Sequence, residues 1–418
     1  MYNNREITLE KIYIIQPITP QNASKYRILQ EEAVALIESA GAAYAGTIYQ
    51  NVREIHSATF VGEGKLLELR ERLDSLEDIT ILFNGELSPS QTLNISEILD
   101  HRKVIDRTTL ILDIFAKNAK SSEGKLQVEL AQLQYLYPRL KGKGIALSRL
   151  GGGVGTRGPG ETQLETDRRY IRNRIKHLEE RLGETEKRRT LQTVRRKKDS
   201  VKTIALVGYT NTGKSTLMNL LTQSDVYVKN ELFATLDPTA RKFEIDGIEF
   251  LLVDTVGFLQ DLPHNLIDAF KSTLESALNC DLALIVCDAM GEYDMQMDTT
   301  LQTLKEMHFN SPYLLVMNKS ENIKDSSVLP FGSIAISAKE NLGIENLKRE
   351  ILKSFRQEFT FCELFVPYEK SAVYAAVKNL LYEQNVEFFD NGQQIQAAIP
   401  CRYSDKFTEF IKNIQTIQ

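Results

Sequence analysis

The residues with the clearest chemistry form one short stretch, GYTNTGKS, at positions 208–215. It fits the pattern G-x-x-x-x-G-K-[ST] and stands between the apolar run IALV, which predicts a strand, and TLMNLLTQ, whose apolar spacing predicts a helix. The two glycines let the backbone come close to an anion, which the loop N–H groups and the helix N-terminus then face. Lys214 supplies a positive charge to the β- and γ-phosphates, and the Ser215 hydroxyl is a ligand for Mg²⁺. The stretch therefore predicts a phosphate-binding loop.

Polar residues also end three other predicted strands of the same region. The stretches are FLLVDTVGF with Asp254 and Gly257, YLLVMNKSE with Asn318 and Lys319, and IAISAKE with Ser337, Ala338 and Lys339. Open α/β sheets bind ligands at the carboxyl ends of their strands, so we expect these residues to gather around the same nucleotide. The aspartate can hold Mg²⁺ through water, and the glycine N–H can contact the γ-phosphate.

These motifs resemble, in order and placement, the five signature motifs of the translation-factor class of GTPases. Four further stretches resemble the HflX family of ribosome-associated GTPases: NGELSPSQ (84–91), EGKLQVELAQLQYLYPRL (123–140), RGPGETQLETDRR (157–169) and FATLDPT (233–239). The resemblance covers about residues 10–360 and is weakest in the C-terminal tail.

The resemblance implies a role for each matched residue. Ser215, Thr235 and Asp254 would hold Mg²⁺, and Lys214, Thr235 and Gly257 would take part in catalysis. Asn318 and Lys319 would hold the guanine ring, and the segment 337–339 would brace it. The nucleotide-binding residues implied in this way are Gly208, Tyr209, Thr210, Asn211, Thr212, Gly213, Lys214, Ser215, Thr216, Phe233, Ala234, Thr235, Leu236, Asp237, Asp254, Thr255, Val256, Gly257, Asn318, Lys319, Glu321, Ser337, Ala338 and Lys339.

The resemblance also implies an activity. It describes a Mg²⁺-dependent GTPase that binds the large (50S) ribosomal subunit, converts GTP to GDP and phosphate, and splits or rescues stalled ribosomes. We also expect the protein to be a monomer. Two other functions stay open: an RNA-remodelling ATPase that uses the N-terminal domain, and a protection factor in which GTP serves only as a switch. The stretch GEGK (62–65) bears on the first of these, but it lacks the flanking spacing of a phosphate loop, and a turn that starts a helix is the simpler interpretation.

Two residues depart from the usual GTPase pattern. Guanine is normally read by Asn-Lys-x-Asp, whereas this chain has Glu321, whose side chain is one methylene longer. We expect a weakened preference for GTP, by about 1–2 kcal/mol if the hydrogen-bond geometry suffers.

Small signalling GTPases orient the attacking water with a glutamine after the switch II glycine, whereas this chain has Phe258. Asn211 is a candidate to bind K⁺ beside the phosphates, although asparagine is also common in turns for conformational reasons alone. We therefore expect slow hydrolysis without the ribosome.

The sequence predicts an α/β protein with four parts. Residues 1–118 form a parallel α/β domain, with strands expected at 11–17, 42–49 and 79–84 and helices at 24–40, 64–74 and 88–99. Residues 119–199 form an antiparallel helical hairpin, residues 200–357 the P-loop GTPase domain, and residues 358–418 a small α+β module. In that module we expect a helix at 369–382, a hairpin turn at Asp390–Asn391–Gly392 and a helix at the end.

The hairpin is expected from two heptad-like apolar stripes, one beginning at Leu126 and the other at Ile171. Between them, the stretch 141–161 contains eight glycines, which argues against a regular helix and for a long tip loop. From Asp167 to Lys198 there are 13 Lys/Arg and 5 Asp/Glu, an excess that favours an anionic partner over a merely solvated helix face. The predicted RNA-binding residues are Lys141, Lys143, Arg149, Arg157, Arg168 and Arg169.

The bulk composition adds little about function. A net charge of −5 over 418 residues does not indicate a nucleic-acid-binding protein, so the local charge segregation carries that argument. The four cysteines are far apart, and we expect them to be buried and reduced. The N-terminal stretch lacks the apolar segment of a signal peptide, and no apolar run approaches the length of a membrane helix, so we expect a cytoplasmic protein.

Overall fold

The structure is a computed structural model that describes residues 9–76, 78–148, 159–198, 201–223, 232–233, 239–260, 279–323 and 329–414. The side chains of 141–148, 159–164, 186, 188–198 and 414 lie outside that description. The chain forms two compact units. The first is built mainly from the residues up to Arg188 and also contains Leu232, Phe233, Leu259 and Gln260; the second is built mainly from the residues after Arg188.

The first unit contains the predicted parallel sheet. Its strands, in the spatial order β2-β1-β3-β4, are β1 (Lys11–Ile18), β2 (Ala43–Asn51), β3 (Ile79–Phe83) and β4 (Val104–Asp106). The helices that alternate with them are α1 (Tyr26–Ala40), α2 (Glu63–Leu73), α3 (Pro89–Ile98) and α4 (Arg107–Asn118). The predicted strands and helices are confirmed to within a few residues. The sequence did not predict β4, because a strand of three residues is too short to show an alternating pattern.

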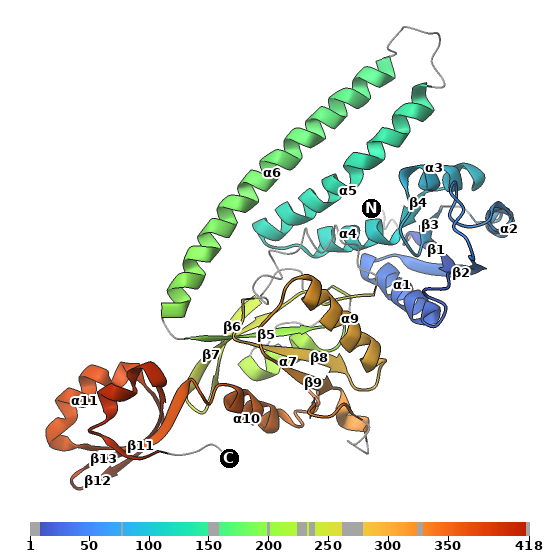
Figure 1. Cartoon of the computed structure of the whole chain (residues 1–418). Coiled ribbons are helices and arrows are strands. Elements are labelled where there is room, and N and C mark those ends of the chain that lie inside the picture. The colour runs from blue at the N-terminus through green and yellow to red at the C-terminus, as the bar shows by residue number, and fades with distance from the viewer. Residues whose placement is uncertain are drawn as a thin grey trace, which may run out of the picture. The chain divides into compact units, whose positions relative to one another are not determined.

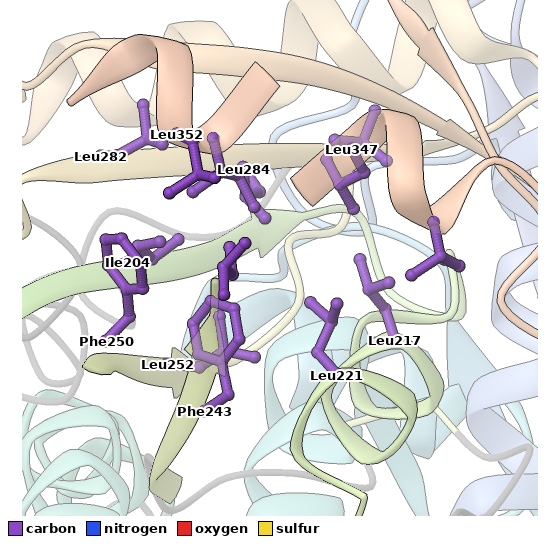
Figure 2. Packing of buried hydrophobic residues seen from close by; sticks show 14 of the residues in the cluster. Ile204, Leu217, Leu221, Phe243, Phe250, Leu252, Leu282, Leu284, Leu347 and Leu352 are labelled. Carbon is purple, nitrogen blue, oxygen red and sulfur yellow. The ribbon is translucent and has the colours of Figure 1, made fainter. Parts of the chain in front are cut away.

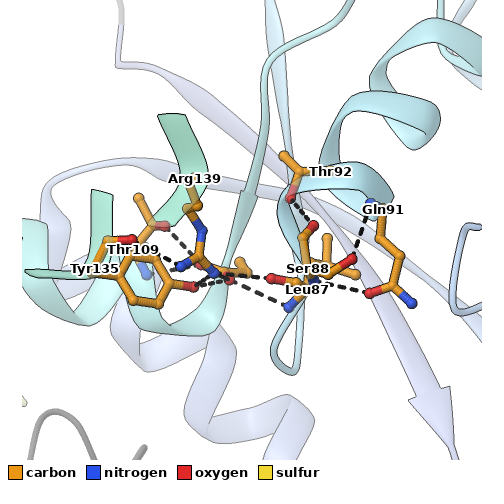
Figure 3. A network of polar contacts seen from close by, with 8 residues as sticks. Leu87, Ser88, Gln91, Thr92, Thr109, Tyr135 and Arg139 are labelled. Carbon is orange, nitrogen blue, oxygen red and sulfur yellow. Dashed lines mark hydrogen bonds and ion pairs between the residues drawn. The ribbon is translucent and has the colours of Figure 1, made fainter. Parts of the chain in front are cut away.

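Capping residues fix the ends of α3 and α4. Ser88 and Gln91 form a capping box at the start of α3, with Pro89 in the first turn. Asp106 caps α4 by accepting a hydrogen bond from the Thr109 amide at 3.0 Å. The same carboxylate accepts from Tyr135 and, at 3.2 Å, from Arg139, both on the next helix. Figure 3 shows Tyr135 and Arg139 within this network of polar contacts. The network therefore fastens the helical hairpin to the end of β4.

The predicted hairpin consists of α5 (Ser122–Ser148) and α6 (Pro159–Lys198), which run side by side in Figure 1. In the predicted apolar stripes, Leu130 of α5 and Ile171 and Leu178 of α6 are buried. The Arg174 guanidinium donates to both oxygens of Glu129, at 2.6 and 2.9 Å, and ties the two helices together.

The expectation of a long irregular tip is wrong for most of its length. The helix α5 continues through residues 141–148, and α6 begins at Pro159, so only residues 149–158 lie outside the described part. Each glycine in a helix costs about 1 kcal/mol relative to alanine, which an already nucleated helix with good helix formers between the glycines can absorb. Proline suits the first turn of α6 because its missing N–H has no helical partner there.

The second unit contains the predicted P-loop domain. Its sheet has the order β10-β9-β8-β5-β7-β6, in which only β6 is antiparallel to its neighbour. The strands are β5 (Lys202–Gly208), β6 (Thr239–Ile245), β7 (Ile248–Asp254), β8 (Leu282–Asp288), β9 (Tyr313–Asn318) and β10 (Ile334–Ala335). The described helices are α7 (Lys214–Thr222), α9 (Tyr293–Glu306), the short 3₁₀ helix η1 (Ser320–Asn322) and α10 (Ile344–Ser354).

The core of this domain fixes the strand ends that carry the motifs. Figure 2 shows side chains of β5, β7 and β8 meeting those of α7 and α10. The buried set includes Ile204, Leu217, Phe250, Leu284 and Leu347. Burying one such side chain contributes about 1.5–3 kcal/mol, so the strand register is strongly determined.

The C-terminal module is an antiparallel sheet with the order β12-β13-β11-β14. Its elements are β11 (Phe359–Pro367), η3 (Tyr368–Lys370), α11 (Ser371–Val377), η4 (Lys378–Leu380), β12 (Tyr382–Phe389), β13 (Gly392–Pro400), η5 (Cys401–Phe407) and β14 (Ile411–Ile414). The hairpin turn at Asp390–Asn391 is confirmed. The helix expected at 369–382 is broken into three short pieces, and the terminal helix is wrong. There β14 pairs with β11, and Phe407 and Phe410 fill the module's core.

Two other expectations concern the chain as a whole. All four cysteines are free, and burial raises the pKa of the Cys280, Cys287 and Cys362 thiols to about 11. Cys401, the first residue of η5, is exposed, contrary to the prediction. In the part of the chain that is described, no helix combines the length and apolar character needed to cross a membrane.

Candidate functional site

The phosphate loop, residues 208–215, lies between β5 and α7 as predicted, and its two glycines are required by contact as well as by torsion. Gly208 has φ +150°, and a Cβ there would lie 2.2 Å from the Val286 carbonyl oxygen. Gly213 has φ +90°, and its Cβ would lie 2.2 Å from the Asn318 amide nitrogen. Any side chain at either position would push the loop away from β8 or β9.

Lys214 is buried, with 6% of its surface exposed. Its Nζ donates to the carbonyl oxygens of Tyr209 at 2.5 Å and Gly208 at 3.1 Å. Burial lowers the pKa of Lys214 to about 8, while the nearby Asp254 carboxylate acts in the opposite direction. The ammonium is therefore held inside the loop, and a phosphate that replaces the carbonyls would favour its charged form.

Oxygen atoms suited to Mg²⁺ meet beside this lysine. The Ser215 hydroxyl donates to Asp254 Oδ2 at 2.7 Å, and Asp254 is buried at the end of β7. A hydroxyl and a carboxylate are the hard ligands that Mg²⁺ takes alongside water and phosphate, so these residues fit the ion.

The stretch after Asp254 lies against the phosphate loop. A Cβ at Gly257 would lie 2.9 Å from Lys214 Nζ, so the backbone passes directly by the ammonium. The Thr210 amide donates to the Phe258 carbonyl at 2.8 Å, and the Phe258 amide donates to the Gly208 carbonyl at 3.1 Å. Phe258 is buried, which agrees with a residue that packs and does not polarise water.

The base-binding motifs are joined to the same loop. The Asn318 amide donates to the Thr212 carbonyl at 2.8 Å and accepts from the Ala338 amide at 2.9 Å. Lys319 Nζ donates to the Asn211 carbonyl at 2.9 Å. Asn318 thus links the phosphate loop to segment 337–339. Lys319 lies across the position expected for the base.

Glu321 lies in η1 and is exposed, and a hydrogen bond from the Ser337 hydroxyl is the main cause of a lowered pKa for its carboxylate. The longer side chain is therefore charged and directed toward Ser337, in the segment predicted to brace guanine.

Asp288 is a site residue that the sequence analysis missed. It ends β8, and its Oδ2 lies 2.6 Å from Lys319 Nζ. A carboxylate at the end of an apolar strand is the same signal that identified Asp254, so LIVCDAM could have revealed it. Asp288 thus holds the Lys319 ammonium in place.

The other predicted residues are distributed as follows. Tyr209, Thr255 and Val256 are buried in the walls of the site, Thr216 lies in α7, and the Lys339 side chain is exposed. Ala234, Thr235, Leu236 and Asp237 lie outside the described residues, as do Arg149 and Arg157. Lys141 and Lys143 belong to α5, with their side chains outside the description, and Arg168 and Arg169 lie on α6, where Arg168 stands 5.8 Å from the Tyr137 ring centroid.

Phe233 packs within the first unit. Its ring meets Phe115 edge-on at 4.6 Å, and its carbonyl accepts from the Asn118 amide group at 2.9 Å. The Leu232 amide donates to the Ser39 hydroxyl at 2.9 Å. These partners come from α1 and α4, and no local sequence pattern could have identified them.

Gln260, two residues after Phe258, is bound in a similar way. Its side-chain oxygen accepts from Lys25 Nζ at 2.8 Å, and its carbonyl accepts from the Arg107 guanidinium at 3.3 Å. Arg107 is itself buried and paired with Glu32 at 2.7 Å. The segments on the two sides of the nucleotide motifs, 232–233 and 259–260, are thus both held by the N-terminal α/β domain.

The stretch GEGK forms the start of α2, as the simpler interpretation predicted. Gly62 precedes the first turn, and Lys65 pairs with Glu68 of the same helix at 2.6 Å.

Three protein-family profiles match successive parts of the chain: GTP-binding GTPase N-terminal over residues 29–116, GTP-binding GTPase Middle Region over 118–196, and 50S ribosome-binding GTPase over 203–319. The chain is 44% identical over 399 residues to GTPase HflX of Caldanaerobacter subterraneus subsp. tengcongensis, covering 94% of this chain and 91% of that one. It is 46% identical over 298 residues to GTPase HflX of Escherichia coli strain K12, covering 71% and 70%. A GTP-binding protein from Sulfolobus solfataricus in complex with GDP is 24% identical, with a TM-score of 0.44 over 84% of this chain and 99% of that one.

The buried Lys214 predicts a pH dependence of nucleotide binding. A pKa of about 8 means that the free protein loses this proton as the pH rises through 8. Bound phosphate raises the pKa, so affinity is full below that pH and falls above it, by up to about tenfold per pH unit. Calorimetry at pH 8.5 in two buffers of different ionisation enthalpy should show proton uptake on GDP binding. Lys242→Ala, which removes an exposed lysine, should leave the uptake unchanged, and absence of uptake by the unaltered chain would contradict the assignment.

Loss of the Asp288–Lys319 ion pair should weaken nucleotide binding and leave the rate of GTP hydrolysis unchanged. Asp288→Asn should weaken GDP and GTP binding by about three- to tenfold, since a hydrogen bond to a charged group contributes about 1.5–3 kcal/mol and this one is partly solvated. The single-turnover rate of bound GTP should not change, because the group that Asp288 holds is Lys319, which is predicted to contact the base. Asp294→Asn, an exposed change in α9, is the control. A slower single-turnover rate with unchanged affinity would reject this role.

Proposed function

The chain belongs to the HflX family of GTPases, and from this premise we propose that it binds the 50S ribosomal subunit in its GTP state and splits or rescues stalled ribosomes. The observation that carries the proposal is the anchoring of segments 232–233 and 259–260, next to the nucleotide motifs, by the N-terminal α/β domain. The match to a 50S ribosome-binding GTPase profile over residues 203–319 supports the choice of partner. Such work would take place in the cytoplasm.

The chain's own residues account for nucleotide binding in the following way. Lys214 would move from its backbone carbonyls to the β- and γ-phosphates, and the loop amides would hold the remaining oxygens. Ser215 and Asp254, joined by Thr235 when GTP is present, would hold Mg²⁺, which neutralises the phosphate charge. The Gly257 amide would contact the γ-phosphate, because its backbone already passes beside Lys214.

Recognition of guanine would fall to Asn318, Lys319 and Glu321. The Glu321 carboxylate is charged and tied to Ser337, so it can accept hydrogen bonds from the ring N–H and amine of guanine, which adenine does not offer. Its extra methylene is the reason to expect a GTP preference weaker than that of an aspartate-bearing site.

Hydrolysis would be slow in the isolated protein. Phe258 is buried against the phosphate loop and cannot orient the attacking water. Positioning and charge are the main sources of catalysis in phosphoryl transfer, so another group must supply them. Asn211, held in a left-handed conformation with φ +60°, is the candidate ligand for K⁺ beside the phosphates.

The bound nucleotide would affect ribosome binding through segments 232–233 and 259–260. A γ-phosphate that draws Thr235 and Gly257 toward itself pulls on residues 232–233 and 259–260, which α1 and α4 hold. The same α/β domain is fastened to the hairpin by Asp106, Tyr135 and Arg139. The hairpin's six basic residues Lys141, Lys143, Arg149, Arg157, Arg168 and Arg169 would then meet ribosomal RNA.

Sedimentation with purified 50S subunits tests this proposal. The unaltered chain should pellet with 50S in a non-hydrolysable GTP analogue and far less in GDP. Lys214→Ala, which removes the phosphate-binding charge, should abolish the difference, and Lys242→Ala on exposed β6 should not. If Lys214→Ala bound and left the subunits as the unaltered chain does, nucleotide control of ribosome binding would be refuted.

The potassium hypothesis predicts a cation effect on turnover. GTP hydrolysis in KCl should exceed that in NaCl at equal ionic strength by about tenfold, which corresponds to about 1.4 kcal/mol of barrier. Asn211→Ala should lose this difference because it removes the proposed side-chain ligand. Equal rates of the unaltered chain in the two salts would leave Asn211 with a conformational role only.

A further inference from the structure

The tip of the β12–β13 hairpin exposes aromatic side chains. Phe388 is 72% exposed and Phe389 is 46% exposed, and they are the last two residues of β12. Successive residues of a strand point to opposite faces, so the tip carries one ring on each side. Tyr368 is 50% exposed, and its hydroxyl donates to the Phe389 carbonyl at 2.9 Å, which adds a third ring.

This tip is held firmly by the module's fold. The ladder between β12 and β13 continues to the last pair, Phe389 opposite Gly392. A Cβ at Gly392 would lie 2.6 Å from the Val366 carbonyl and 2.9 Å from the Phe365 ring, so the strands pack closely here. Rings on an ordered hairpin lose little conformational entropy when they bind, which favours their use as interface anchors.

Three acidic residues lie next to the rings in the sequence. Glu369, Glu387 and Asp390 are all exposed beside them. Within the described residues, no cationic side chain lies within 4.0 Å of these three carboxylates; the neighbouring Lys370 is 2.8 Å from Glu409, and Lys378 is 3.1 Å from Glu383. The residues from 358 to 418 include five Lys/Arg and eight Asp/Glu, a net charge of −3, whereas α6 is strongly basic.

Exposed rings beside carboxylates that have no cationic partner among the described residues indicate which kind of molecule this surface can bind. Phosphates are repelled by carboxylates, so this surface does not fit RNA. Lysine and arginine side chains are attracted to both features, because their charge pairs with carboxylates and also lies favourably over aromatic rings.

We propose that the hairpin tip, residues 387–390 with Tyr368 and Glu369, is a docking site for a lysine- and arginine-rich protein segment exposed on the 50S subunit. This rests on the proposed function, since it assumes that the chain binds that subunit. The basic hairpin would then contact RNA while the acidic tip contacts protein.

A photo-crosslinking amino acid placed at Phe388 of the full chain tests the proposal directly. After irradiation with purified 50S and a non-hydrolysable GTP analogue, we expect a crosslink to a basic ribosomal protein. Phe331 is a matched control position, because it is also a fully exposed phenylalanine, at 108%, outside the tip. Crosslinks to ribosomal RNA, or none while the protein still sediments with 50S, would overturn the docking site alone. Failure of the unaltered chain to sediment with 50S would overturn the proposed function as well.

A charge-reversal variant gives an independent answer. Glu369→Lys, Glu387→Lys and Asp390→Lys together should weaken 50S binding by about tenfold, because they repel a basic segment. Phe331→Ser is the control for surface changes, and GTP affinity should stay unchanged in both variants. Tighter binding by the lysine variant would indicate a phosphate partner and overturn the proposal, and so would unaltered binding.

Discussion

The structure depends on a buried ammonium inside a loop that only glycine can form. Gly208 and Gly213 let the loop lie against β8 and β9, where a Cβ would be 2.2 Å from its neighbours. The Lys214 ammonium is then buried and donates hydrogen bonds to the loop's own carbonyl oxygens. Three other motif residues contact this loop: Asp254 bonds to Ser215, Gly257 lies close to Lys214, and Asn318 bonds to Thr212. A GTPase built this way has a site whose positive charge and polar groups are already positioned for phosphate.

The local parts of the site could be predicted from the sequence because each is a strand followed by a polar residue or a glycine. The apolar runs before Gly208, Asp254 and Asn318 place all three at one edge of the sheet, and the structure confirms them. The sequence analysis overlooked Asp288, although it obeys the same rule.

What could not be predicted depends on contacts between distant residues. Nothing near Ser39 or Asn118 indicates that they bind Leu232 and Phe233, which lie 193 and 115 positions away. The helical continuation of α5 through its glycines depends on a helix already formed by packing, and β14 depends on pairing with β11. In each case tertiary structure overrides local propensity.

If the nucleotide changes how the N-terminal domain holds segments 232–233 and 259–260, hydrogen exchange of the Leu232 amide should respond to it. That amide donates to Ser39 Oγ at 2.9 Å, so its exchange reports the contact. The Leu232 amide should exchange at a different rate in a GTP analogue with Mg²⁺ than in GDP. Ser39→Ala should lose that difference. Equal exchange at Leu232 in both nucleotide states of the unaltered chain would contradict this prediction.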